Sequence, residues 1–185
     1  MGKPHFLSLL LLFILCTIEY SQQSLDDKIS NYLNDKTKGA SHDLADKSKF
    51  LAAHGLARAK KGLMPLMWDS KLAKYAQDWA LKRKSDCELE HSFQDGQFTL
   101  GENIFKGSGS DWTPKDAVKI WMEEENNYSY DSNSCADGKM CGHYTQIVWR
   151  NTKKVGCARV ICDNKDTFMI CNYDPVGNVF GEKPY

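Results

Sequence analysis

The chain has 185 residues, of which 42% are hydrophobic and 26% are charged. Its 24 basic side chains balance its 24 acidic ones, so it has no basic excess that would attract nucleic acid, and no such partner is predicted. A chain of this length usually folds as one domain.

The first residues have the pattern of a secretory signal peptide. A short basic start at Lys3 precedes a nearly uninterrupted apolar stretch, residues 6–18. We expect residues 1–21 to be removed by cleavage near Ser21, which would make the mature protein secreted and extracellular. No later apolar stretch approaches the roughly 20 residues needed to cross a bilayer, so the mature chain is not predicted to span a membrane.

A polar stretch rich in Asp, Lys, Ser and Asn follows, at residues 22–47. It is predicted to be a flexible arm or an extra short helix. The folded domain is expected to cover residues 48–185, with residues 175–185 as its C-terminal tail.

Two helices are predicted at the start of this domain. The first covers residues 48–61, is capped at Asp46 or Ser48, and carries His54 on its apolar, inward face. The second begins at Asp69 or the next residue. Its expected inward residues are Leu72, Tyr75, Ala76 and Trp79.

A third helix is predicted from a capping residue, a proline at the first helical position and an acid in the first turn: Thr113, Pro114 and Asp116. Its expected inward residues are Ala117, Ile120, Trp121 and Glu124. Glu124 is therefore an acid on the apolar face of this helix. His54 is likewise a titratable residue on the apolar face of the first helix. Both need partners, because a buried charge is costly unless it is paired, hydrogen-bonded or bound to a metal.

The later chain is predicted to form strands. Short stretches rich in β-branched and aromatic residues occur at residues 145–150, 157–162 and 168–173. Turn-forming residues separate them at hairpin lengths, which favours an antiparallel sheet. Helices followed by strands predict an α+β fold, as a three-layer α-β-α sandwich with a central antiparallel sheet.

Seven cysteines are present, and Cys16 would leave with the signal peptide. Six cysteines in an oxidising compartment predict three disulfides, and the residues alone leave all 15 pairings open. A cysteine zinc site is not predicted, because no C-x-x-C pair occurs. The six are Cys87, Cys135, Cys141, Cys157, Cys162 and Cys171.

Glu102 and His143 are the candidate partners of His54 and Glu124, since each enters a strand-like segment. Two imidazoles and two carboxylates would suit a divalent ion such as zinc. The alternative is a histidine bonded to a glutamate inside the core, and the spacing does not separate the two. Neither G-x-S-x-G nor G-x-G-x-x-G occurs, so no hydrolase elbow or dinucleotide site is predicted.

Aromatic residues cluster at and just after the third helix. Trp121, Tyr128 and Tyr130 could line a groove for an apolar ligand, or belong to the core. Asn127 begins an N-glycosylation sequon, which would place its loop at the surface if a glycan is attached.

Longer motifs point to a known family. The stretches Gly142-His-Tyr-Thr-Gln-Ile-Val-Trp-Arg-Asn151 and Cys171-Asn-Tyr-Asp-Pro-Val-Gly-Asn178 resemble the CAP superfamily of cysteine-rich secretory, antigen-five and pathogenesis-related proteins. Shorter matches are Met67-Trp68-Asp69, His91-Ser92 and Gly101-Glu-Asn103. The resemblance covers about residues 48–185, and the ending at Tyr185 resembles the plant pathogenesis-related 1 branch.

The resemblance implies a cleft lined by His54, Glu102, Glu124 and His143. A divalent ion such as zinc could bind there, but no cofactor is required and no catalytic role is established, so the protein is not expected to be an enzyme. The family usually has asparagine where this chain has Gly55. Glycine inside a helix destabilises the helix by about 1 kcal/mol relative to alanine. Close packing against a neighbouring segment would be a reason for glycine at this position.

The resemblance also implies a disulfide pairing and a function. The expected pairs are Cys87–Cys162, Cys135–Cys141 and Cys157–Cys171. The implied function is antimicrobial plant defence by a secreted monomer that binds sterol or a similar apolar lipid near Trp121, Tyr128 and Tyr130.

Two further activities are open at this point. In the plant branch a processing protease can release a signalling peptide, which here would be Pro175–Tyr185 after cleavage between Asp174 and Pro175. The alternative function is a metal-dependent hydrolase, in which the ion activates water and Glu102 or Glu124 acts as the base.

Overall fold

The computed structural model describes the backbone of residues 5–93 and 99–185. Within these ranges, side chains are described from residue 21 onward except at 35, 36 and 38–42. The expected signal peptide and Cys16 lie outside the described side chains and stay predictions. Among the described residues, no helix is long and apolar enough to cross a membrane.

The chain divides into two compact units, Met1–Asp43 and Leu44–Tyr185. The helices are α1 (His5–Ala59), α2 (Ser70–Arg83), α3 (Pro114–Glu123), the short 3-10 helix η1 (Glu124–Asn127) and α4 (Gly142–Ile147). The strands are β1 (Met67–Trp68), β2 (Gly101–Gly107), β3 (Tyr128–Ser129), β4 (Ser134–Cys135), β5 (Lys154–Ile161) and β6 (Thr167–Asp174).

The first unit is helical, and α1 continues from it into the second unit. Nearly all described side chains from residue 21 to 34 are exposed. The cap expected at Asp46 or Ser48 is therefore wrong, because α1 runs through both positions. Asp46 instead accepts a hydrogen bond from Arg159 Nε at 2.7 Å. The division of the domain at residue 48 remains a prediction.

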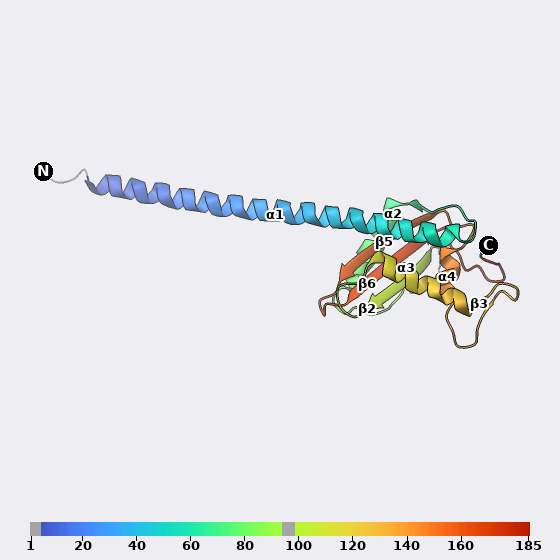
Figure 1. Cartoon of the computed structure of the whole chain (residues 1–185). Coiled ribbons are helices and arrows are strands. Elements are labelled where there is room, and N and C mark those ends of the chain that lie inside the picture. The colour runs from blue at the N-terminus through green and yellow to red at the C-terminus, as the bar shows by residue number, and fades with distance from the viewer. Residues whose placement is uncertain (1–4, 94–98) are drawn as a thin grey trace. The chain divides into compact units, whose positions relative to one another are not determined.

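The second unit is a three-layer α-β-α sandwich (Figure 1). Its main sheet has the order β1-β5-β6-β2; β6 pairs antiparallel with β5 and β2, and the short β1 pairs parallel with β5. Successive side chains of β6 alternate between two cores, as the pleat requires. Met169, Cys171 and Tyr173 pack with α1, α3 and α4, whereas Phe168 and Ile170 pack with α2.

The caps of α2 and α3 follow the sequence prediction. Asp69 accepts hydrogen bonds from the backbone N–H groups of Lys71 and Leu72 at the start of α2. Thr113 and Asp116 form a reciprocal capping box at the start of α3. Two expected inward residues are half-exposed, however: Tyr75 in α2 and Ile120 in α3.

The strand predicted at residues 145–150 is wrong, because residues 145–147 belong to α4 and no strand covers residues 148–150. Its side chains from Tyr144 to Trp149 are all buried. A fully buried stretch shows no alternation that would separate strand from helix, and its β-branched and aromatic residues favour a strand locally.

The three disulfides join Cys87 to Cys162, Cys135 to Cys141 and Cys157 to Cys171, which confirms the pairing implied by the family resemblance. Cys87–Cys162 connects the loop after α2 to the end of β5. Cys157–Cys171 joins opposite residues of β5 and β6.

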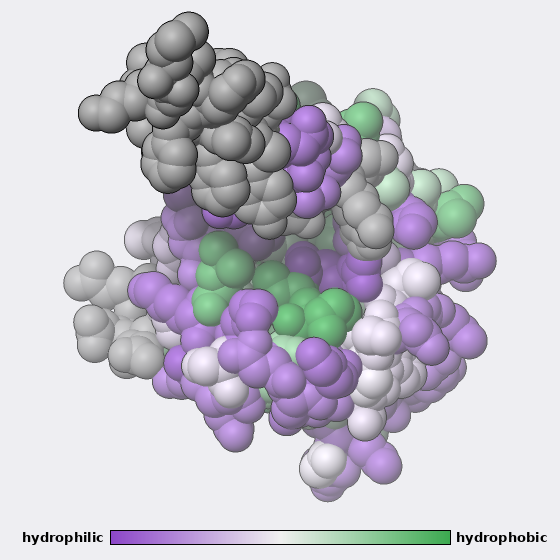
Figure 2. Space-filling view, turned by 90° about the vertical axis from the view of Figure 1, so that its left-hand side faces the viewer, coloured by the Kyte–Doolittle hydropathy of each residue, from purple (hydrophilic) through white to green (hydrophobic). Residues whose placement is uncertain are grey.

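On the face shown in Figure 2, hydrophilic residues cover most of the described surface, with a smaller hydrophobic area exposed between them.

Close packing does not explain Gly55. A Cβ atom added there would meet nothing within 4 Å, whereas one at Gly156 would lie 2.1 Å from the backbone nitrogen of Ala73 in α2. Gly55→Ala should therefore raise the free energy of unfolding by about 1 kcal/mol, because alanine is the better helix former. Gly156→Ala should lower it by about 2 kcal/mol or more, because α2 and β5 must separate.

Urea unfolding of both variants beside the wild type measures these changes. A destabilised Gly55→Ala variant would show that a constraint on this helix position has been overlooked.

Candidate functional site

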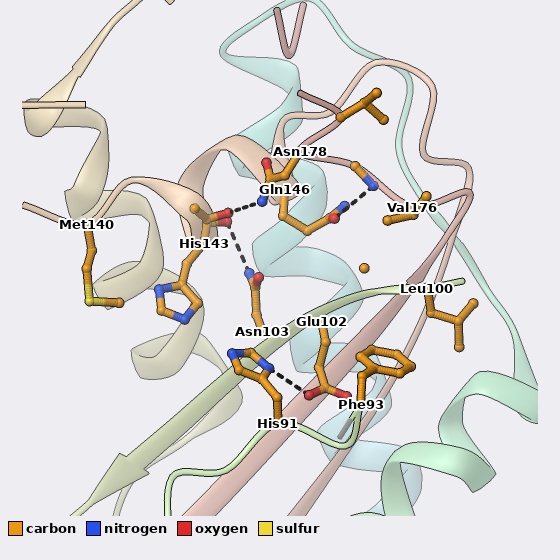
Figure 3. Close-up of a pocket in the computed structure, with 14 residues that line it drawn as sticks. His91, Phe93, Leu100, Glu102, Asn103, Met140, His143, Gln146, Val176 and Asn178 are labelled. Atoms are coloured by element: carbon orange, nitrogen blue, oxygen red, sulfur yellow. Dashed lines mark hydrogen bonds and ion pairs between the residues drawn. The ribbon is translucent and has the colours of Figure 1, made fainter. Parts of the chain in front are cut away.

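A cavity of about 670 Å³ lies between the start of β2, α4 and the C-terminal segment (Figure 3). Its polar lining side chains come from the loop before β2, from β2, from α4 and from the C-terminal segment: His91, Glu102, Asn103, His143, Gln146 and Asn178. Its apolar lining side chains are Phe93, Leu100, Met140, Val176 and Val179.

Two histidines of the site are each oriented by a carboxylate. His91 Nδ1 lies 2.8 Å from Glu102 Oε1, and His143 Nδ1 lies 2.6 Å from Glu124 Oε1. A carboxylate can only accept, so each Nδ1 carries the proton. In the neutral form of each ring, Nε2 is then the nitrogen that can accept a hydrogen bond or bind an ion.

Glu102 is held in a dense set of hydrogen bonds. Besides His91, it accepts from the Ser92 backbone N–H at 2.9 Å, from the Ser92 hydroxyl and from Asn172 Nδ2 at 2.8 Å. Burial raises the pKa of the Glu102 carboxyl, but these hydrogen bonds outweigh it and hold the pKa below its usual value.

Glu124 has two tasks, since it binds the His143 ring and also caps α4. One carboxylate oxygen accepts from the backbone N–H groups of His143 at 2.9 Å and Tyr144 at 3.3 Å. The His143 ring stacks on Trp121, with 6.0 Å between centroids and 18° between planes. The misfit acid of the third predicted helix is therefore a partner of His143.

His54 does not lie in the cavity, which corrects the site implied by the resemblance. It is fully buried; its Nδ1–H donates to the Phe50 carbonyl at 2.8 Å, and its Nε2 accepts from the Tyr173 hydroxyl at 2.9 Å. The inward periodicity was right, but the inward face of α1 packs on the core rather than on the cavity.

His91 lines the cavity where His54 was expected. It lies in a loop, where no helical or strand period marks a residue as out of place. Its match to a short family motif was the only feature of the sequence that could have identified it. Gly55, next to His54 in the chain, is therefore no argument against ion binding in the cavity.

A chain of hydrogen bonds connects His54 to the cavity wall. Asn103 Nδ2 donates to the Tyr173 hydroxyl at 3.2 Å and to the His143 carbonyl at 3.0 Å. The Tyr173 hydroxyl in turn donates to His54. His54 thus supports the position of α4 from behind the cavity.

The three aromatic residues expected to bind lipid do not line the cavity. Trp121 is buried and its indole N–H donates to the Ile104 carbonyl at 3.1 Å. Tyr128 packs on Tyr144, and Tyr130 stacks on Tyr185, the last residue. Trp121 therefore faces the core, whereas Tyr128 lines a second, smaller hollow of about 300 Å³. Lipid binding by these three residues remains a prediction.

Asn127, the sequon residue, is partly exposed at the end of η1, and its amide donates to the Met140 carbonyl at 3.3 Å. Asp174 ends β6, and the exposed Pro175 follows it. Glycan attachment and cleavage at this bond both remain predictions.

The cavity offers two imidazoles as candidate ligands for a divalent ion. His91 and His143 are the residues that would bind it through Nε2, with Glu102 and Glu124 as the outer hydrogen-bond partners that orient them, an arrangement common at zinc sites. Within the described part of the chain, no three His, Cys, Asp or Glu residues converge into a larger ligand group.

The pKa of His54 is lowered to about 4, mainly by burial. The hydrogen bond to the Phe50 carbonyl raises this pKa, and the nearby Arg58 charge lowers it further. The unfolded chain, with an ordinary histidine pKa near 6.5, therefore binds this proton more readily. The His54 contribution to stability should be complete above about pH 6.5 and be lost as the pH falls towards 4, by about 3 kcal/mol.

Urea unfolding at pH 7 and pH 4 tests this with His54→Gln, which cannot titrate. The wild type should lose about 3 kcal/mol more than the variant between the two pH values. An equal loss would show that His54 is protonated in the folded protein at pH 4.

Comparison with known proteins places this chain in a family. The model of the Cysteine-rich secretory protein family, CAP, matches residues 51–173. Pathogenesis-related protein PR-1 of Medicago truncatula is 57% identical over 140 residues, which cover 75% of this chain and 79% of that protein. Pathogenesis-related protein 1A of Nicotiana tabacum is 52% identical over 136 residues, which cover 74% of this chain and 79% of that protein.

Solved structures share the fold. The crystal structure of Na-ASP-1 matches with a TM-score of 0.62 and 26% identity, covering 75% of this chain and 40% of that one. The structure of NaASP2 with Zn²⁺ matches with a TM-score of 0.60 and 25% identity, covering 76% of this chain and 84% of that one. The chain belongs to the cysteine-rich secretory protein (CAP) family and is similar to plant pathogenesis-related 1 proteins.

Proposed function

We propose that the chain is a secreted, pathogenesis-related 1-like defence protein that binds a sterol or similar apolar lipid in the cavity. The names of its relatives support the defence role. The three disulfides support an oxidising, extracellular location.

The observation that carries the lipid proposal is the lining of the cavity. Five apolar side chains surround a volume of about 670 Å³, within the range of small-molecule sites. A few polar groups lie among them, and His91 and His143 each present an Nε2 lone pair that can accept a hydroxyl proton. A large apolar body with a single hydroxyl, as in a sterol, matches this combination.

Met140 offers a clean test, because it lines the cavity and its side chain is mostly exposed. Met140→Glu should weaken the binding of a labelled sterol about tenfold, since a charge would have to be desolvated against an apolar ligand. Met64→Glu is the matched control, because Met64 is also exposed and is not among the cavity residues.

Fluorescence titration with the labelled sterol gives the dissociation constants. The absence of saturable sterol binding by the wild type would contradict the lipid proposal. An equal loss of sterol affinity in Met140→Glu and Met64→Glu would show that the ligand does not bind in this cavity.

The alternative, metal-dependent hydrolysis, needs a carboxylate that is free to take a proton from water. Glu102 accepts hydrogen bonds from four donor groups, and Glu124 binds the His143 ring and two backbone N–H groups. Neither is free for this task, so a binding role is the better match.

Ion binding without catalysis remains part of the proposal, and zinc titration by calorimetry tests which histidines serve it. His91→Ala and His143→Ala should each weaken zinc binding at least about tenfold, a loss no smaller than that seen when outer-shell partners are removed. His54→Gln should leave it unchanged. The opposite ranking would restore His54 to the site.

Release of the tail as a signalling peptide is a second proposal. It is supported by the exposure of Pro175, the first residue after β6, and of 41% of the Asp174 side chain, although Asp174 itself forms the last pair of β6 with Lys154. Cleavage would have to disturb two hydrogen bonds, from the Lys153 N–H to the Asp174 carbonyl and from the Thr152 hydroxyl to the Pro175 carbonyl.

Mass spectrometry of extracellular fluid after microbial challenge should detect the fragment Pro175–Tyr185. Repeated detection of the intact C-terminus alone would count against release.

A further inference from the structure

The disulfide Cys135–Cys141 is the most accessible of the three. Cys135 is partly exposed, whereas the other five described cysteines are buried. Both of its cysteines line the second hollow of about 300 Å³, and among the described residues no cysteine of the other two disulfides lines either hollow. The residues between the two cysteines, 136–140, are all exposed. A small reagent in water can therefore reach this bond more readily than the other two.

This disulfide ties α4 to the β3–β4 hairpin. Cys135 ends β4, which pairs with β3, and the N–H of the next residue, Ala136, donates to the Asn127 carbonyl at 2.8 Å. Cys141 immediately precedes α4. Its carbonyl accepts from the Thr145 N–H at 2.9 Å and from the Thr145 hydroxyl at 3.1 Å. Each cysteine is thus fixed to its own element, and the S–S bond joins the two elements.

The segment that this disulfide holds also forms part of the cavity wall. Met140 and His143, on either side of Cys141 in the chain, both line the cavity of about 670 Å³ (Figure 3). With the disulfide open, the Met140 carbonyl would keep an exposed hydrogen bond of 3.3 Å from Asn127 Nδ2, and Glu124 would still bind His143. Opening should therefore loosen this wall without removing it.

The rest of the fold should tolerate the loss of this bond. The two cysteines are 6 residues apart, whereas those of the other pairs are 14 and 75 residues apart. In the chain-entropy model, a disulfide that closes a shorter loop restricts the unfolded chain less, so its loss destabilises the fold less. This bond therefore combines the best access with the smallest structural role, which is what a reversible switch needs.

We propose that Cys135–Cys141 is a site of reversible thiol–disulfide exchange with small thiols, and that its opening loosens the start of α4 and the cavity wall. The thiolate of the small molecule attacks Sγ of Cys135, the more exposed cysteine. A new S–S bond forms to Cys135, the bond between Cys135 and Cys141 breaks, and Cys141 Sγ leaves with the electron pair and takes a proton from water.

A second small thiol then attacks the adduct. It is oxidised together with the first to a small disulfide, and Cys135 is left as a thiol, for which the Lys139 carbonyl at 3.3 Å is an acceptor. An excess of the small disulfide reverses both steps. The proposal does not depend on which ligand the cavity binds.

Mapping of the cysteines tests the site. Folded wild-type protein is incubated with increasing concentrations of reduced glutathione, quenched with iodoacetamide and analysed by peptide mass spectrometry. The glutathione adduct should appear on Cys135 and the alkyl group on Cys141, at a thiol concentration at least about tenfold below that which opens either other pair. Opening of another pair at the same or a lower concentration, an adduct on Cys141, or no opening of this pair would overturn the proposal.

Hydrogen exchange of the Thr145 amide, followed by NMR, tests the effect on α4. At the glutathione concentration that opens only this pair, the wild-type Thr145 amide should exchange about tenfold faster, which is less than the typical contribution of a disulfide would allow. Oxidised glutathione should restore the slow rate. Amides of β6 should keep their rates throughout, because the rest of the fold stays closed.

A paired variant, Cys135→Ala with Cys141→Ala, should show the fast Thr145 exchange whether or not glutathione is present. Lys139→Ala, in the same exposed loop, is the control and should exchange as the wild type does. If the paired variant does not fold, the wild-type comparison decides. Equal Thr145 exchange in wild-type protein with the pair open and with the pair closed would overturn the proposal.

Discussion

The short helix α4 is held at its two ends by opposite charges from distant parts of the chain, and the site depends on this. A helix of this length is not stable alone, and its ends leave N–H and C=O groups unpaired. The Glu124 carboxylate accepts the first N–H groups, while the buried Arg58 guanidinium donates to the carbonyls of Ile147 at 2.9 Å and Trp149 at 2.8 Å. An anion at the start and a cation at the end also suit the helix dipole.

Fixing α4 positions both the cavity and the tail. His143 and Gln146 project from α4 into the cavity, and Gln146 Oε1 also accepts from the Gly177 N–H at 3.0 Å. A Cβ atom at Gly177 would lie 2.8 Å from the Gln146 amide, so only glycine lets the tail approach this closely. The Thr145 hydroxyl adds a bond to Asn178 Oδ1 at 2.6 Å. Helix α4 therefore contributes both to the wall of the proposed lipid site and to the contacts that hold residues 177 and 178 of the tail.

Local sequence predicted the elements whose stabilising contacts are local. The caps at Asp69 and Thr113 lie within a few residues of the helices they begin, so the pattern contains them. The partners of α4 lie far away in sequence, and its own residues favour a strand, so only the fold reveals the helix. Helical periodicity placed His54 correctly inward but could not predict whether it faces a cavity or the core. His91 was missed because it lies in a loop, where no helical or strand periodicity marks inward positions. The disulfide pairing came from family resemblance, because six cysteines alone leave it open.

Hydrogen exchange within α4 tests the central claim, that Glu124 holds this helix. The Thr145 and Val148 amides donate to the carbonyls of Cys141 and Tyr144, so their exchange reports on α4. In Glu124→Ala both amides should exchange about tenfold faster than in the wild type, as expected for the loss of a cap, while amides of β6 keep their rates. The neighbouring, exposed Glu123 provides the control, and Glu123→Ala should leave α4 unchanged. Unchanged exchange of Thr145 and Val148 in Glu124→Ala would contradict the account.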